Sequence, residues 1–219
     1  MEITITPHPL LDVRAFLTRY NRPLSRVKTP GEVLALFSPA CNTPLKTDEN
    51  VKKLVRDLLR YGGFKPTGRS KPASEYLIKA VEKGWFGPER GINLAVDVCN
   101  VVSLHSGLPI SVIDADLAIE PWSIDVMPAG TEYVFNPSGQ SIDIGRLISF
   151  CDQNGPCAGP VKDSQRTKTH DKTQQTLTVI WGTQALPGRT EEALKWYRFL
   201  LSAAGVVTEP VHLISGDPS

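Results

Sequence analysis

The chain has 219 residues, of which 41% are hydrophobic and 21% are charged. This length can bury a sizeable core, and the composition is typical of globular proteins. No apolar run approaches the roughly 20 residues that a membrane span needs, which excludes a transmembrane helix. The N-terminal residues MEITITPHPLL contain no basic region followed by an apolar one, so we expect no export signal and a cytoplasmic protein.

The net charge of +1 is unevenly distributed along the chain. Residues 1–90 carry 16 Lys and Arg against 9 Asp and Glu, whereas residues 91–219 carry 8 against 14. Such asymmetry allows the first part to present a basic surface to a polyanion. The alternative is that the two parts attract each other on folding, and charge alone does not decide between them.

The cysteines do not indicate a metal centre. Cys41, Cys99, Cys151 and Cys157 lack the paired C-x-x-C units of a zinc site. Neither G-x-G-x-x-G nor G-x-x-x-x-G-K-[ST] occurs, which argues against dinucleotide and P-loop chemistry. We therefore expect reduced thiols, no metal and no cofactor, with a Cys151–Cys157 bridge as the less favoured alternative.

The first half of the chain is predicted to be mainly helical after one short strand. Residues 2–6 alternate and favour β-branched side chains, whereas the apolar residues of 10–20 fall near helical spacing. An amphipathic helix is predicted from a cap at Asp48 to about Tyr61, stopped by Gly62 and Gly63. Further helices are predicted from about Ala73 and over 94–104, where Asp97, Asn100 and Ser103 form a polar stripe that indicates a buried network or a site.

The second half is predicted to be richer in strands. Strands are expected at 110–118, in a hairpin over 131–144, at 177–181 and at 206–214, where Pro210 suits an edge or a break. A helix is expected over 190–205. This mixture lacks regular alternation and predicts the α+β class. We expect one domain over 1–219, with an N-terminal helical lobe at 1–64 and a core module at 65–219.

Two polar segments are candidates for a site. The first carries Lys65, Arg69 and Lys71 and runs into a helix N-terminus, where amides and cations hold phosphate; a solvated connector is the alternative. The second, residues 151–175, reads as a long loop, which is uncommon in a compact domain unless it is functional or disordered. A Ser164 hydrolase with His105 or His170 as base is disfavoured, since no G-x-S-x-G elbow is present.

Residues 92–110 read I-N-x-x-V-D-x-x-N-x-V-S-L-x-x-G-L-P-I and are followed by D-A-D-L. With KPASEYLIKA upstream and FNPSGQSID and VKDSQRTKTHDKT downstream, this pattern resembles the B3/4 editing module of the bacterial phenylalanyl-tRNA synthetase beta subunit. More closely, it resembles free-standing proteins that consist of this module alone. The resemblance covers roughly residues 65–181. It implies a mixed α+β module with a β-sandwich-like core flanked by helices, and a ligand that is the aminoacylated 3′ end of a tRNA.

In the synthetase the module hydrolyses tRNA charged with tyrosine instead of phenylalanine, so its site residues are compared one at a time. Asn100 and Asp114 match pocket positions of the family, and Asp171 and Thr173 match the D-x-T of a loop that lines its site. Three positions depart from the family pattern: Cys99 replaces a Thr, Ser111 a His and Val179 a Glu.

From the loop and the resemblance together, the predicted substrate-binding residues are Cys99, Asn100, Ser111, Asp114, Lys162, Asp163, Ser164, Thr169, Asp171 and Thr173. The predicted RNA-binding residues are Lys65, Arg69 and Lys71.

Two hypotheses of different classes follow. In the first, the protein hydrolyses misacylated tRNA or a related aminoacyl ester in trans, with Asn100, Ser111, Lys162 and Ser164 holding the ester and its developing oxyanion. In the second, hydrolysis has been lost, and the module binds tRNA or a small amino-acid-like ligand without turnover. The expected partner is a tRNA 3′ end or an aminoacyl ester, not DNA or a membrane. We do not expect the chain to be a synthetase by itself.

Overall fold

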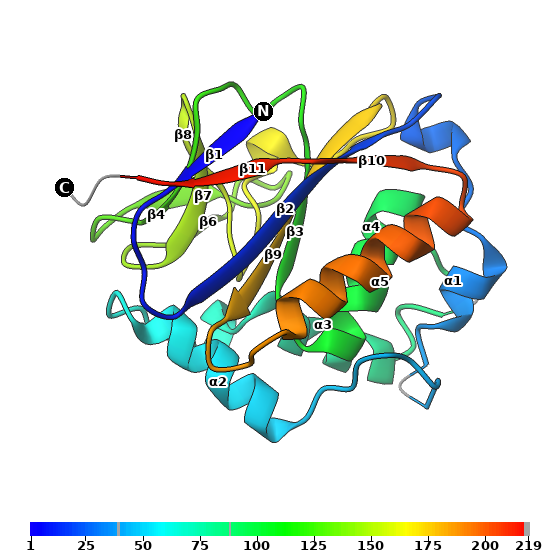
Figure 1. Ribbon diagram of the computed structural model, residues 1–219, viewed down its shortest axis with the longest axis horizontal. Helices are drawn as coiled ribbons and strands as arrows, with labels where there is room; N and C mark the ends of the chain where they lie inside the picture. Colours follow the sequence, from blue (N-terminus) through cyan, green and yellow to red (C-terminus); the bar gives the residue numbers. More distant parts are fainter. Residues whose placement is uncertain (39, 88, 217–219) are drawn as a thin grey trace.

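The computed structural model describes residues 1–38, 40–87 and 89–216, and within them two β-sheets pack together beside a short hairpin (Figure 1). The first sheet has the strand order β11 (His212–Ser215), β1 (Glu2–Ile5), β4 (Trp122–Val126), β7 (Ile148–Asp152) and β8 (Gly155–Ala158). The second sheet is antiparallel, with the order β10 (Val207–Pro210), β2 (Leu11–Arg19), β9 (Gln175–Thr183) and β3 (Ile110–Asp114). The hairpin consists of β5 (Glu132–Val134) and β6 (Ser141–Asp143).

Helices cover the face of the second sheet that points away from the first sheet (Figure 1). Phe16 of β2 meets Tyr197 edge to face at 5.1 Å, and the Tyr197 hydroxyl donates to the carbonyl of Ala95 at 3.3 Å. The helices are α1 (Gly31–Ala35), α2 (Glu49–Arg60), α3 (Ala73–Glu82), α4 (Leu94–Ser106) and α5 (Arg189–Ala203). The mixed α+β class predicted from the sequence is confirmed. Among the described residues, no helix is long and apolar enough to cross a bilayer.

The helix predicted over 10–20 is wrong, because this segment is the strand β2. Residues 11–15 read LDVRA and alternate as in a half-buried strand, but Phe16 and Leu17 are both buried and interrupt the alternation, so the apolar spacing also fits a helix. All nine residues pair with β9, and this pairing decides between two conformations that the local pattern allows. Residues 1–64, expected to be a helical lobe, therefore supply one strand to each sheet.

Two further segments differ from their predictions. Residues 151–175, expected to be one long loop, contain the end of β7, the strand β8, and a 3-10 turn at Gln165–Thr167. The C-terminal strand expected over 206–214 is two strands, and the chain passes from the second sheet to the first after Pro210. Proline has no N–H to donate, which fits a break in pairing at this point.

The polar stripe of α4 forms a buried network at two of its three residues. Asp97 is fully buried, accepts the N–H of Ile92 at 2.8 Å and accepts the Thr29 hydroxyl at 2.6 Å. The Ser103 hydroxyl donates to the carbonyl of Leu108 at 2.7 Å. Burial raises the pKa of Asp97, and the two hydrogen bonds offset part of this effect. These two residues tie the ends of α4 to its neighbours, whereas Asn100 between them is half-buried.

Candidate functional site

Ser111 lies on the face of β3 that points toward the first sheet. Its hydroxyl donates to the carbonyl of Gly159 at 3.3 Å and accepts the indole N–H of Trp181 at 3.0 Å. It pairs across the sheet with Val179, which is fully buried. The hydroxyl hydrogen of Ser111 is therefore already used within the protein, and its neighbour Val179 has no group that transfers a proton.

Asp163 lies beside Ser111 in the loop that follows β8. Its carboxylate accepts the N–H of Gly159 at 3.2 Å. Burial raises the pKa of Asp163 to about 6, although the hydrogen bond from the Gly159 N–H favours the charged form. A carboxylate that ionises close to neutral pH at a cost in stability is a feature of functional sites more often than of ordinary surfaces.

Replacing Asp163 by Asn is expected to stabilise the fold at pH 8. The folded carboxyl has the higher pKa, so between about pH 6 and pH 4 the folded state binds more protons than the unfolded state, and wild-type stability falls as the pH rises through this window. The neutral amide avoids this loss. Urea unfolding at pH 8 and pH 4 measures it, with the exposed Asp116→Asn as control. An equal effect of Asp163→Asn at both pH values would contradict the assignment.

Lys162, the residue before Asp163, lies near two further cations, and one of them comes from a distant segment. The Lys162 ammonium lies 3.7 Å from the centroid of the Phe135 ring, and the Lys168 ammonium donates to the Phe135 carbonyl. Burial, then the charges of Arg69 and Lys168, lower the pKa of Lys162, so both of these cations lie within electrostatic reach of Lys162.

The Arg69 segment is tied to the Lys162 segment by the backbone hydrogen bond from Ala73 N–H to the Pro160 carbonyl at 2.9 Å. In the described part of the chain, Arg69, Lys162 and Lys168 form no ion pair within 4.0 Å of a carboxylate. The result is a local excess of positive charge that favours an anion.

The loop that carries these cations is held by a charged pair. Arg166 forms a bidentate contact with Asp152 at 2.7 and 2.8 Å, and the Asp152 side chain is 0% exposed. Burial disfavours the charged form of Asp152, but the hydrogen bonds from Arg166 and from the N–H groups of Asn154 and Ile119 outweigh it and lower its pKa. Asp152 thereby fixes the loop between β8 and β9 onto the β7–β8 hairpin.

A second group of predicted residues lies at the C-terminal end of β3. Asp114 is 2% exposed, accepts the Thr173 hydroxyl and lies 3.2 Å from Nε2 of His170. His170 Nδ1 accepts the N–H of Lys172 at 3.2 Å, so Nε2 carries the hydrogen of the neutral ring. Asp171 lines a separate pocket of about 400 Å³, which Asp97 also lines. The contacts of Asp114, His170 and Thr173 stabilise a turn.

The group around Ser111 and the group around Asp114 lie on opposite faces of the second sheet. Ser111 and Asp114 are three residues apart on one strand, and successive side chains of a strand alternate between faces. Cys99 lies on the helix-covered side, where its thiol contacts the carbonyl of Ile110 at 3.6 Å.

Among the predicted substrate-binding residues, Ser111, Lys162, Asp163 and Ser164 therefore gather beside the hairpin, whereas Cys99, Asn100, Asp114, Asp171 and Thr173 belong to the helix-covered side or to the turn. Thr169 is half-buried between Lys168 and the turn.

Several neighbours of this cluster were not predicted from the sequence. Phe135 contacts two of the cations, Trp181 orients Ser111, and the buried Tyr133 hydroxyl donates to the Lys162 carbonyl. Phe135 and Tyr133 belong to the hairpin, whose turn sequence was read as structural. These two aromatic residues are connected to a site only because the hairpin lies next to the basic loop in space. That proximity is not visible in the sequence. Within the described ranges, no three His, Cys, Asp or Glu side chains are grouped to hold a metal ion.

Comparison with known proteins identifies the family of this α+β module. The family model of the B3/4 domain matches residues 67–186, which is more than half of the chain, so the chain belongs to the B3/4 domain family. Among solved structures it is similar to an N-terminal fragment of the phenylalanyl-tRNA synthetase beta subunit from Pyrococcus horikoshii, with a TM-score of 0.53 and 10% sequence identity. The alignment covers 99% of this chain and 53% of that one, so this chain spans about half of the fragment. No curated protein gives a significant match.

Proposed function

We propose that this protein binds the aminoacylated 3′ end of a tRNA between the basic segment 65–72 and the loop 159–169. The supporting observation is the meeting of Arg69, Lys162 and Lys168, none of which is paired with a carboxylate within the described residues. Contacts between cations and phosphates provide much of the affinity of nucleic-acid complexes. Family membership and the likeness to a phenylalanyl-tRNA synthetase fragment agree with a tRNA ligand. We further propose that the protein is cytoplasmic and that its nucleic-acid ligand is RNA, not DNA.

Hydrolysis of the aminoacyl ester in trans is the finer form of this proposal. A water molecule would attack the ester carbonyl, Asp163 would accept its proton, and Lys162 would stabilise the oxyanion. Collapse of this intermediate would break the ester C–O bond, and the leaving 3′ oxygen of the tRNA would take the proton from Asp163, which releases the free amino acid. The Ser111 hydroxyl is already engaged and Val179 is apolar, so the chemistry would not use the residue types that the synthetase module has at these positions. This difference supports binding without turnover as the alternative, with tRNA or a small amino-acid-like molecule as ligand.

The proposal is tested in two assays on the full chain. Gel shifts with total tRNA at about 50 mM and about 200 mM salt are expected to show binding that weakens steeply, because bound cations release counterions from the phosphates. No shift at either salt concentration would reject RNA binding. Deacylation is then measured over a panel of mischarged tRNAs. Binding without activity above background on any of them would reject hydrolysis and retain the binding function.

A further inference from the structure

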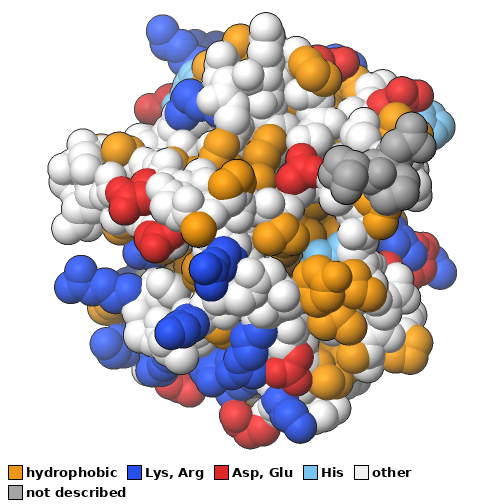
Figure 2. Space-filling model, turned by 90° about the vertical axis from the view of Figure 1, so that its left-hand side faces the viewer, with side chains coloured by type: hydrophobic (Ala, Val, Ile, Leu, Met, Phe, Trp, Pro, Cys, Tyr) orange, Lys and Arg blue, Asp and Glu red, His pale blue; other side chains and the backbone are white. Residues whose placement is uncertain are grey.

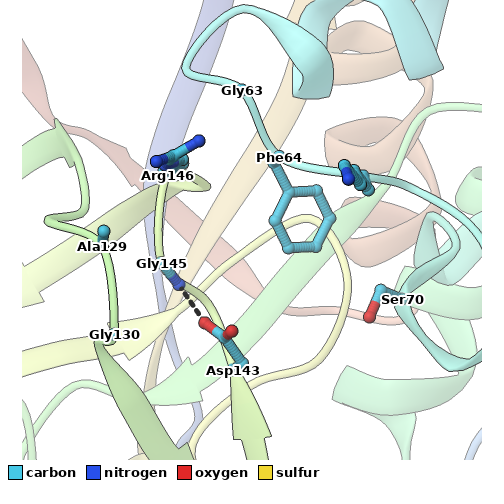
Figure 3. A pocket seen from close by; sticks show the side chains of 9 residues that line it. Gly63, Phe64, Ser70, Ala129, Gly130, Asp143, Gly145 and Arg146 are labelled. Atoms are coloured by element: carbon cyan, nitrogen blue, oxygen red, sulfur yellow. Dashed lines mark hydrogen bonds between the residues drawn. The ribbon is translucent and has the colours of Figure 1, made fainter.

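A pocket with basic residues in its wall lies near the loop that carries Arg69. It has a volume of about 380 Å³ and lies where the segment after α2 meets the connections β4–β5 and β6–β7 (Figure 3). Its side chains are Phe64, Lys65, Ser70, Asp143 and Arg146. Ser70 is adjacent in sequence to Arg69, so the pocket and the basic cluster described above share one segment. Figure 2 shows Lys and Arg side chains gathered on the lower half of the face that includes the C-terminal end of α2.

Arg146 is held in this pocket by an unusual backbone. Its φ is +68°, in the left-handed region that residues other than glycine rarely adopt. The segment after α2 packs closely against Arg146. A Cβ on Gly62 would lie 2.4 Å from the Arg146 carbonyl oxygen, and one on Gly63 would lie 3.2 Å from Cδ of Arg146. The strain is thus maintained at a position whose side chain lines a pocket, which is where stored strain commonly serves function.

The pocket presents both signs of charge. Lys65 and Arg146 are exposed, and among the described residues neither has a carboxylate within 4.0 Å. Asp143 is exposed and uses one carboxylate oxygen to accept the Gly145 N–H at 2.7 Å, so its second oxygen remains available as an acceptor. Phe64 forms an apolar wall between these groups (Figure 3).

We propose that this pocket binds one ribonucleotide of the same RNA strand, an inference that rests on the proposed RNA-binding function. Lys65 and Arg146 would contact the phosphate, because ammonium and guanidinium groups form charge-assisted hydrogen bonds with phosphate oxygens. The Asp143 carboxylate accepts hydrogen bonds only, which suits a ribose hydroxyl and opposes a second phosphate. Since DNA lacks the 2′-hydroxyl, Asp143 gives the pocket a basis for selecting RNA.

The test compares a single-stranded RNA that ends in CCA with a DNA of the same sequence, at fixed salt. The wild-type chain is expected to bind the RNA more tightly. Asp143→Asn is expected to reduce the RNA preference by about tenfold, since the amide oxygen stays with the Gly145 N–H and the free carboxylate oxygen is replaced by an uncharged NH2 group that cannot accept. Arg146→Gln is expected to weaken RNA and DNA alike by about tenfold through loss of a phosphate contact.

The controls are Glu132→Gln and Arg22→Gln. Glu132 is exposed and pairs directly with Asp143 in the hairpin, but it does not line the pocket, and Arg22 is an exposed cation elsewhere. Thermal unfolding checks that all variants are folded. If Asp143→Asn keeps the full RNA preference, or Arg146→Gln binds both strands like the wild type, the ribonucleotide subsite is wrong while the RNA-binding function remains. If the wild-type chain binds no RNA, both proposals are wrong.

Discussion

Replacing Arg69, Lys162 and Lys168 together by glutamine is expected to weaken tRNA binding by about a hundredfold at about 0.1 M salt, while the fold is retained. Each lost phosphate contact also lowers the slope of log affinity against log salt by about 0.7–0.9, so three contacts should lower it by about 2. Both effects follow from the proximity of Arg69 and Lys168 to Lys162. Fluorescence anisotropy with a labelled tRNA over a salt series measures them.

A control variant with the same loss of charge shows whether tRNA affinity depends on where the cations lie or only on the net charge. Arg22, Arg26 and Lys195 are exposed and lie outside the segments 65–72 and 159–169. Their combined replacement by glutamine removes three positive charges as well, and we expect it to change tRNA affinity by only a fewfold. Equal losses in the two triple variants would mean that tRNA responds to the total charge and not to the proposed cluster.

Replacing Arg166 by glutamine is expected to lower the free energy of unfolding by about 3 kcal/mol, because it leaves the buried Asp152 carboxylate without its charged partner. For a chain of this size, that loss corresponds to a fall in melting temperature of roughly 6–12 °C. The wild-type pair stabilises the fold at neutral pH. Because the pKa of Asp152 is lowered on folding, its contribution is present above the unfolded pKa and is lost as the pH falls through the folded value.

Denaturant unfolding at pH 7 and pH 3 measures this effect, with Arg60→Gln as the matched control. Nη1 of Arg60 and Oδ1 of Asp57 lie 2.6 Å apart and form an ion pair as well. Both side chains are at least 40% exposed, so this pair contributes at most about 1 kcal/mol to the free energy of unfolding. A loss for Arg166→Gln no greater than that of the control would contradict the structural role of the pair. Since Arg166 fixes the loop that carries Lys162 and Lys168, its replacement should also weaken tRNA binding at temperatures where the chain remains folded.

The elements that the sequence predicted well have strong local signals. Helix α2 has Asp48 as its cap, with the N–H of Val51 donating to its carboxylate at 2.8 Å, and α4 ends at Gly107, whose φ is +70°. The hairpin β5–β6 was indicated by its turn residues. By contrast, the alternation of β2 is interrupted where Phe16 and Leu17 are both buried, so its apolar spacing also fits a helix, and only its pairing with β9 decides that it is a strand.

The candidate site was less predictable, because its residues meet through tertiary structure. The sequence grouped Ser111 with Asp114, but the alternation of β3 sends them to opposite faces, where they have different hydrogen-bond partners. The meeting of Arg69 with Lys162 depends on contact between segments about 90 residues apart in the sequence. Arg146 has no distinguishing neighbours in SIDIGRLISF, and only its left-handed backbone and its pocket draw attention to it.

The most direct test of the central claim is hydrogen–deuterium exchange of the full chain with and without an aminoacylated minihelix that ends in CCA. On adding the RNA, we expect slower amide exchange in residues 65–72 and 159–169, and little change in the turn that holds His170, Lys172 and Thr173. Unchanged exchange in both segments, under conditions where anisotropy shows the RNA to be bound, would contradict it.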